Sequence, residues 1–247
     1  MNRLLAVWKL AGAVVHLLAG LFTILLLFPR MTQGQKQLRV QAWSAAMVSR
    51  LGIRIIVRGH PAAGAGTLLM ANHISWLDIT ALHAAMFCRF IAKGDVRHWP
   101  VIGYMAAQAG TLFIERASRR DAMRVVHQMA ASLRAGEVLA VFPEGTTSDG
   151  ERLLPFHANL FQAAISADAP VQPVAIGFID QASGKRSQAP CYIGDDSLLS
   201  SVWRTLRTPD IAVVIRFGEP QMAQGKDRRA WAAHVRAAVQ ALQNEPH

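Results

Sequence analysis

The segment from Thr67 to Asp78, TLLMANHISWLD, joins a short apolar run to a polar turn and then to the first residues of a helix. A short apolar run that ends in polar residues is typical of a buried strand. Ser75, followed three residues later by Asp78, has the arrangement that satisfies free backbone amides at a helix N-terminus. A strand that passes directly into a helix is the building unit of α/β proteins, so this segment indicates the fold class.

Outward from this segment, apolar strand-like runs alternate with helical patterns. Strands are expected at 53–57, 67–70, 87–92, 111–114, 138–142, 171–178 and 211–217, and helices at 79–85, 100–108, 119–135, 159–167 and 228–243. This alternation predicts an α/β domain with a largely parallel central sheet flanked by helices. Ligands gather at the carboxyl ends of the strands in such a sheet.

Ionisable residues follow three of the expected strands. His73 comes just after the run TLLM, Glu115 and Arg116 follow TLFI, and Glu144 follows VLAVF. Because parallel strands end at the same edge of a sheet, these groups are expected to converge there.

His73 and Asp78 have two interpretations. Five residues along a continuous helix rotate by about 500°, so the two side chains meet only if His73 lies in the turn before the helix and Asp78 in its first turn. A carboxylate on one imidazole nitrogen then leaves the other nitrogen as a general base. The alternative is that Ser75 and Asp78 only cap the helix. The sequence SRRD at 118–121 has the same capping pattern without a preceding histidine, so Asn72-His73 carries the functional signal.

Two further stretches combine a strand end with polar groups. FPEGTTS, residues 142–148, places Glu144, Gly145, Thr146 and Thr147 in a tight turn whose amides and hydroxyls suit a polar ligand. Arg116, at the end of GTLFIER, offers a guanidinium for a phosphate or carboxylate. Taken singly, each is also compatible with an ordinary surface turn or strand end.

The positive charge is concentrated in the N-terminal quarter of the chain. The net charge is +10, yet eight Lys and Arg residues and no acid precede Asp78, which leaves 18 basic and 16 acidic residues after that point. Nucleic-acid binding would place the cations over the folded part with exposed aromatic residues, a pattern that is missing here. The charge distribution favours a membrane lipid surface over nucleic acid.

The same quarter holds the most apolar stretch, the 19 residues from Leu10 to Phe28. It is long enough to cross or enter a bilayer. FPRMTQGQKQ follows it without a small-residue cleavage site, so we expect a retained anchor. Flanking cations, denser after the run, place the main body on the cytoplasmic side of the inner membrane. Residues 35–51 have the pattern of an amphipathic helix on anionic headgroups or of a surface helix, so 1–51 is the expected anchor and 52–247 the α/β domain.

The chain has two cysteines, Cys88 and Cys191, without paired spacing. They favour neither a disulfide framework nor a metal site, and we expect both to be buried.

Four blocks in order resemble a known family. NHISWLD, LFIER, FPEGTTS and VQPVAI (171–176) are similar to the four sequence blocks of the glycerolipid acyltransferases, in particular the 1-acylglycerol-3-phosphate acyltransferases. The resemblance implies that His73 is a general base oriented by Asp78. It also implies an acceptor site that includes Asn72, Arg116, Glu144, Gly145, Thr146, Thr147 and Pro173.

The implied reaction is direct acyl transfer from acyl-CoA or acyl carrier protein to the hydroxyl of a lysolipid, without cofactor or metal. The absence of a G-x-S-x-G nucleophile elbow agrees with a mechanism that forms no acyl-enzyme.

The chain departs from the family at Thr147, where members that act on lysophosphatidic acid commonly have arginine. Another acceptor, such as lyso-ornithine lipid, is therefore an alternative to 1-acylglycerol-3-phosphate. Two readings of other classes also stand: a metal-dependent hydrolase that uses His73, Asp78 and His83, and a non-enzymatic, membrane-anchored lipid carrier.

Overall fold

A computed structural model describes residues 3–62, 66–114 and 119–246, apart from the side chains of Arg119, Arg120 and Ala122. Seven strands form one sheet in the order β1-β7-β6-β2-β5-β3-β4. They are β1 (Arg54–Arg58), β2 (Leu68–Ala71), β3 (Arg89–Lys93), β4 (Leu112–Ile114), β5 (Leu139–Val141), β6 (Val171–Asp180) and β7 (Ile211–Phe217). Every strand expected from the sequence is present within a few residues of its predicted position.

The sheet is mostly parallel, which confirms the predicted α/β class. Strands β6, β2, β5, β3 and β4 run in one direction, and β7 with its neighbour β1 runs in the other. The antiparallel β6–β7 pair was not predicted, because periodicity within a strand carries no information about the direction of its neighbour.

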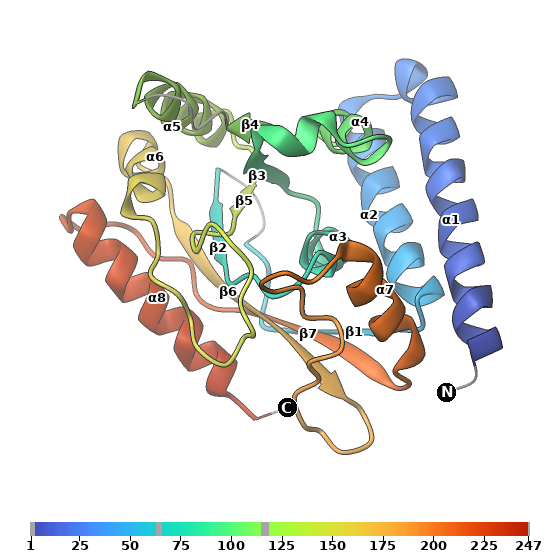
Figure 1. Ribbon diagram of the computed structural model, residues 1–247. Coiled ribbons are helices and arrows are strands. Elements are labelled where there is room, and N and C mark those ends of the chain that lie inside the picture. The colour runs from blue at the N-terminus through green and yellow to red at the C-terminus, as the bar shows by residue number, and fades with distance from the viewer. Residues whose placement is uncertain (1–2, 63–65, 115–118, 247) are drawn as a thin grey trace.

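Helices cover both faces of the sheet (Figure 1). The described helices are α1 (Arg3–Leu26), α2 (Gln33–Arg50), α3 (Leu77–Ala85), α4 (Ile102–Gln108), α5 (Arg119–Arg134), α6 (Phe161–Ala167), α7 (Leu198–Arg207) and α8 (Arg228–Asn244), with short 3-10 turns η1 (Phe28–Arg30), η2 (Gly94–His98) and η3 (Ala158–Leu160). Helix α7 was not predicted.

Alternate residues of the strands feed two separate cores. Leu69 of β2 and Ile176 of β6 pack with α2, α3 and α7 on one face. Leu68 and Ala175, their neighbours in sequence, pack with α5, α6 and α8 on the other face. This period of two places strands that are apolar on both sides at the centre of a three-layer structure.

Helices α1 and α2 form an antiparallel pair at one side of the domain (Figure 1). Trp43 of α2 donates its Nε1–H to the carbonyl of His16 at 3.0 Å, and the Nε2–H of His16 donates to the carbonyl of Trp43 at 2.9 Å. The two rings stack at 5.2 Å between centroids. Gly20 leaves room for this contact, since a Cβ there would come within 2.4 Å of Trp43 Nε1.

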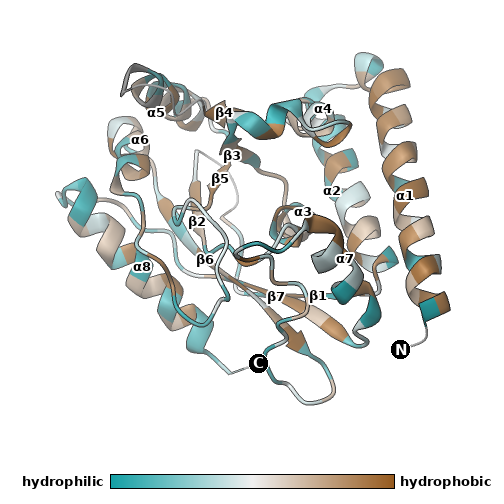
Figure 2. Cartoon of the chain, viewed as in Figure 1, coloured by the Kyte–Doolittle hydropathy of each residue, from teal (hydrophilic) through white to brown (hydrophobic). Residues whose placement is uncertain are grey.

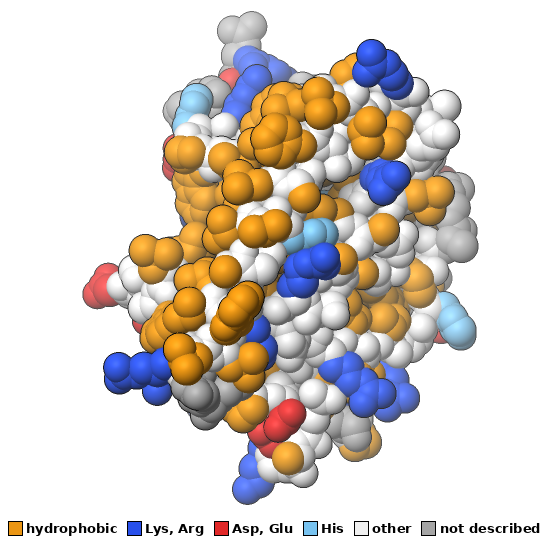
Figure 3. Space-filling view, turned by 90° about the vertical axis from the view of Figure 1, so that its right-hand side faces the viewer, with side chains coloured by type: hydrophobic (Ala, Val, Ile, Leu, Met, Phe, Trp, Pro, Cys, Tyr) orange, Lys and Arg blue, Asp and Glu red, His pale blue; other side chains and the backbone are white. Residues whose placement is uncertain are grey.

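The outward face of α1 is apolar and exposed, as its hydropathy shows (Figure 2). Trp8 is 76% exposed, Val15 66% and Phe22 60%. Figure 3 looks onto this side of the molecule, where hydrophobic side chains gather with Lys and Arg among them. Within the described residues, α1 is the one helix that is long and apolar enough to cross a membrane. The division of the chain at residue 51 stays a prediction.

Candidate active site

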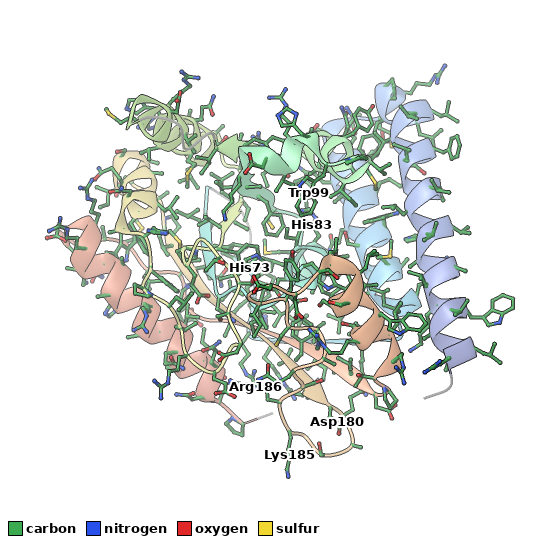
Figure 4. The ribbon with its side chains drawn as sticks, in the orientation of Figure 1. His73, His83, Trp99, Asp180, Lys185 and Arg186 are labelled. Atoms are coloured by element: carbon green, nitrogen blue, oxygen red, sulfur yellow. The ribbon has the colours of Figure 1, made fainter. Side chains whose placement is uncertain are left out.

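His73 and Asp78 meet in the turn between β2 and α3, near the centre of the molecule (Figure 4). The Nδ1–H of His73 donates to Asp78 Oδ2 at 2.8 Å. The same oxygen accepts the backbone N–H of Ile74 at 2.7 Å and of Ser75 at 2.9 Å. Three donors on one oxygen fix the orientation of the Asp78 side chain, which is fully buried. The pair is therefore held in one orientation, with Nδ1 as the protonated nitrogen.

The remaining nitrogen of His73 is available. The side chain is 19% exposed, and within the described part of the chain no group bonds to Nε2. The ring stacks on Phe142 with 4.0 Å between centroids and an angle of 6°. An imidazole fixed at one nitrogen, supported on its face and open at the other nitrogen is suited to accept a proton.

The helix cap differs from the expected one. Helix α3 begins at Leu77 with Trp76 in the N-cap position. Ser75 Oγ accepts the N–H of Leu77 at 3.2 Å and donates to the carbonyl of Pro190 at 2.5 Å. Asp78 does accept the N–H of Ser75, as expected. The same carboxyl oxygen therefore caps the start of the helix and bonds to His73. In the comparison sequence SRRD, Ser118 lies outside the described residues.

Asn72 is committed to the sheet. Its Nδ2–H donates to the carbonyl of Ile176 at 2.9 Å, and its Oδ1 accepts the N–H of the same residue at 2.7 Å. The side chain is fully buried. Asn72 thus extends the β2–β6 pairing past the end of β2, and this geometry favours a positioning role over the substrate contact expected from the sequence.

Glu144 holds the His73 turn from the neighbouring strand end. Its Oε1 accepts the backbone N–H of His73 at 2.8 Å, and its Oε2 accepts the N–H of Leu154 at 2.8 Å. Burial raises the pKa of Glu144, and the two amides oppose that shift. Ser148 completes the connection, because its N–H donates to the carbonyl of His73 at 2.9 Å.

The rest of the FPEGTTS turn lies beside this contact. Gly145 has φ of +72°, a left-handed conformation that glycine adopts without strain. Thr146 is exposed. The hydroxyl of Thr147 donates to the carbonyl of Tyr192, so the residue that stands in place of the family's arginine bonds within the protein.

Two other predicted residues lie elsewhere or outside the described residues. Pro173 is buried in β6, where it pairs with Met70 of β2, and its carbonyl accepts the N–H of Gly218. Arg116 and Glu115 fall outside the described residues. They follow β4 in the sequence. Because β2, β5, β3 and β4 are parallel, β2, β5 and β4 end at one edge of the sheet as expected.

Lys93 is a candidate that the sequence analysis missed. It is exposed at the carboxyl end of β3, paired with Ile114 and located between the ends of β5 and β4. The sequence contains the pattern that would have identified it, because Lys93 follows the apolar run FIA just as His73 follows an apolar strand. A second missed segment is 189–192, which contacts the turn through Tyr192 N–H and Ile74 O at 3.1 Å.

A large apolar pocket lies between helices α1, α2, α3 and α4. Its volume is about 380 Å³, and it includes Gly20 and Ile24 of α1, Ala46 of α2, Ile79 of α3 and Ala106 of α4. Since α3 also carries Asp78 in its first turn, the pocket and the His–Asp pair share one helix. An apolar space of this kind suits a hydrocarbon chain.

The hydrolase reading gains no support from the structure. His83 Nε2–H donates to the carbonyl of Cys88 at 2.9 Å, and burial lowers the pKa of His83 to about 4. The described residues contain no group of three or more His, Cys, Asp and Glu side chains that would hold a metal ion. Cys88 and Cys191 are buried, as expected.

Comparison with known proteins shows which family the chain resembles. The Acyltransferase family profile matches residues 54–177. A lyso-ornithine lipid O-acyltransferase of Pseudomonas aeruginosa is 41% identical over 80% of this chain and 75% of its own length. A 1-acyl-sn-glycerol-3-phosphate acyltransferase of Neisseria gonorrhoeae is 39% identical over 72% and 69%.

A third relative spans nearly the whole chain. A lyso-ornithine lipid O-acyltransferase of Brucella abortus is 37% identical over 96% of this chain and 93% of its own length. The crystal structure of the 1-acyl-sn-glycerophosphate acyltransferase from Thermotoga maritima has the same fold, with a TM-score of 0.68 and 21% identity over 99% of this chain and 97% of that one. The matched residues include His73, Asp78, Glu144 and the strands that position them, and the chain belongs to the acyltransferase family.

Proposed function

We propose that this chain transfers a fatty acyl group from a thioester donor to the free hydroxyl of a lysolipid at a membrane surface. The observation that carries the proposal is the His73–Asp78 pair: one imidazole nitrogen is fixed by a buried carboxylate, and the other is open. The family match supports acyl transfer as the chemistry of that open nitrogen.

In the proposed step, Nε2 of His73 removes the proton of the lysolipid hydroxyl as its oxygen attacks the thioester carbonyl carbon. The carbon–oxygen bond forms, the carbon–sulfur bond breaks, and the released thiolate takes up a proton. Asp78 stabilises the imidazolium that forms, as carboxylates do in related His–Asp pairs. The donor is acyl-CoA or acyl carrier protein, and neither needs a covalent enzyme intermediate because the thiolate is already a competent leaving group.

Two acceptors fit the family equally well. The relatives from Pseudomonas aeruginosa and Brucella abortus are named for lyso-ornithine lipid, and the relative from Neisseria gonorrhoeae for 1-acyl-sn-glycerol-3-phosphate. Thr147 favours lyso-ornithine lipid, because its hydroxyl is bonded to Tyr192 and it adds no cation for a phosphate. We infer that Lys93 and Arg116 supply the cations that meet the anionic group of either acceptor.

The lipid nature of the substrate accounts for the pocket and for α1. The apolar pocket between α1 and α4 accommodates an acyl chain, and the exposed apolar face of α1 rests in the bilayer from which the lysolipid comes. Flanking cations such as Lys9 and Arg30 favour an anionic leaflet. The cytoplasmic side of the inner membrane follows from their distribution as a prediction.

The test is an acylation assay with the full chain in detergent micelles. Acyl-CoA and acyl carrier protein thioesters are each offered with lyso-ornithine lipid, 1-acylglycerol-3-phosphate and other lysophospholipids. Transfer to at least one lysolipid is expected, and the preferred acceptor identifies the substrate. Transfer to none of them with either donor would show that the proposed function is wrong. Hydrolysis of the thioester without transfer would support the hydrolase hypothesis. Exchange of lipid between membranes without acyl transfer would support the lipid-carrier hypothesis.

A further inference from the structure

A four-residue segment outside the four sequence blocks closes over the catalytic turn. Residues 189–192, here called the strap, lie in the connection between β6 and α7, which returns to the centre of the molecule (Figure 1). All four carbonyls of the strap accept hydrogen bonds from side chains. Four successive carbonyls that each have a side-chain partner depart from the general pattern, because about two-thirds of protein hydrogen bonds join two backbone groups.

The strap contacts the turn at the residues that orient Asp78. The N–H of Tyr192 donates to the carbonyl of Ile74 at 3.1 Å, and the hydroxyl of Ser75 donates to the carbonyl of Pro190 at 2.5 Å. The N–H groups of Ile74 and Ser75 are the two backbone donors to Asp78 Oδ2. The position of the strap therefore affects the oxygen to which His73 bonds.

Helix α7 holds the strap from the other side, chiefly through Arg204. Its Nε–H donates to the carbonyl of Ala189 at 3.0 Å, and its Nη2–H donates to the carbonyl of Cys191. Asp196 orients the guanidinium through Oδ2 at 2.9 Å. A planar guanidinium that bonds two carbonyls at once fixes their spacing, which a single point charge does not.

Ser201 adds a second contact one turn earlier on α7. It is fully buried, donates to the carbonyl of Cys191 at 3.0 Å and accepts the indole N–H of Trp76 at 3.2 Å. Trp76 precedes the first residue of α3. The catalytic turn is thus connected to α7 both through the strap and directly.

We propose that Arg204 is a positioning residue of the acyltransferase centre. It holds the strap against Ile74 and Ser75 and thereby keeps Asp78 Oδ2 at hydrogen-bond distance from His73 Nδ1. Arg204 has no bond to His73 or Asp78 in the structure, so it acts through the strap. The inference rests on the proposed function for its kinetic test, and a spectroscopic test stands independently of activity.

The kinetic test compares Arg204→Met with Arg207→Met, an exposed arginine of the same helix. Misplacing a catalytic group by about 1 Å costs up to about 100-fold in rate, so we expect kcat of Arg204→Met to fall by about 10- to 100-fold. KM for donor and acceptor stays unchanged, and Arg204→Lys recovers part of the loss. Arg207→Met keeps the wild-type kcat. Unchanged kcat in Arg204→Met, or a rise in KM alone, would overturn the proposal.

A double substitution separates positioning from a general loss of fold. If Arg204 acts through the His–Asp pair, Arg204→Met causes no further loss of kcat in a His73→Ala background, because residues that act as a unit are not additive. If Arg204→Met instead lowers kcat by the same factor in both backgrounds, Arg204 has only a structural role. If Arg204→Met does not fold, Asp196→Asn takes its place and is expected to lower kcat by a smaller factor.

The spectroscopic test follows the Nδ1 proton of His73 in protein with ¹⁵N-labelled histidine. The wild type and Arg207→Met are expected to show a protected, downfield proton, and Arg204→Met to show it broadened or in exchange with solvent. The signal unchanged in a folded Arg204→Met would contradict the proposal even if no lysolipid is acylated. Failure of acyl transfer in the wild type, with the expected change of this signal, would count against the proposed function alone.

Discussion

The carboxylate of Glu144 accepts the backbone N–H of His73 across a sequence separation of 71 residues. Its second oxygen holds Leu154, whose carbonyl in turn accepts the guanidinium of Arg236 from α8 at 3.0 Å. Glu144 therefore supports the turn of His73 and Asp78 from β5 and α8, while the strap supports it from α7. Glu144 and Ser148 of the third sequence block thus hold the backbone of His73 from both its N–H and its carbonyl.

Replacing His73 or Asp78, the proposed catalytic pair, should abolish most of the activity without loss of fold. His73→Ala removes the base and is expected to lower kcat by about 10²- to 10⁴-fold. Asp78→Asn should have a comparable effect, because an amide oriented by the N–H groups of Ile74 and Ser75 no longer attracts the imidazolium. Initial rates under saturating substrates measure both effects. Wild-type rates in both folded variants would exclude the assigned roles.

Asn72→Ala tests whether Asn72 positions the turn or binds substrate. The substitution leaves the N–H and carbonyl of Ile176 unpaired in a buried site, which costs about 1–3 kcal/mol for each group. We expect a lower free energy of unfolding in urea and a reduced kcat, with KM for the acceptor unchanged. The control is Asn159→Ala on the surface, where a change within about 0.5 kcal/mol is expected. A normal stability with a raised acceptor KM would instead indicate a substrate contact.

Glu144 makes a specific contribution to the pH dependence of stability. Burial raises the pKa of Glu144 above its ordinary value of 4.5. At a pH between the ordinary pKa and the raised pKa of the folded state, the folded chain therefore binds more protons than the unfolded one. The free energy of unfolding must then fall as pH rises through that window. Glu144→Gln cannot titrate and lacks this contribution.

The measurement is the difference in unfolding free energy, wild type minus Glu144→Gln, across the acidic range. We expect the difference to decrease from pH 4 upward and to become constant above the folded pKa. The glutamine amide also places N–H groups against the N–H of His73 or Leu154, so the variant should be less stable by about 1–3 kcal/mol at neutral pH. A difference that rises with pH would show that the pKa is lowered in the folded state.

Filling the apolar pocket should change the preferred acyl chain. Ala106→Phe places a larger side chain on the pocket wall, whereas Ala107→Phe lies on the exposed side of the same helix. Each methylene that no longer fits costs about 0.8 kcal/mol, or about fourfold in kcat/KM. A series of acyl donors of increasing length should show the loss in Ala106→Phe for the longer chains only. The same length profile in both variants would place the acyl chain elsewhere.

The exposed face of α1 is expected to bind lipid directly. Val15→Asp combined with Phe22→Asp removes two apolar contacts, each worth about 1.5–3 kcal/mol when buried, so partition into vesicles should weaken by at least about tenfold. Met123→Asp, 61% exposed on α5, is the matched control. Flotation with vesicles that contain anionic lipid measures the effect. Equal loss in the control, or no loss in the double variant, would show that α1 is not the lipid-binding surface.

Local pattern was sufficient for much of this protein. The positions of the strands, the two-sided apolar character of β2 and β6, the apolar N-terminal helix and the meeting of His73 with Asp78 all follow from residues within a few positions of one another. Helical and strand periods, and the geometry of a turn at a helix N-terminus, are determined by nearby residues.

Only the tertiary structure shows which partners the other polar residues have. Asn72 and Glu144 were expected at the substrate, and their partners are backbone groups of Ile176 and His73 that lie 104 and 71 residues away. The antiparallel direction of β7, helix α7 and the strap held by Arg204 were not predicted either. Such pairings depend on which strand ends and loops meet in the folded chain, and hydrophobic periodicity specifies the buried face of an element without specifying its partner.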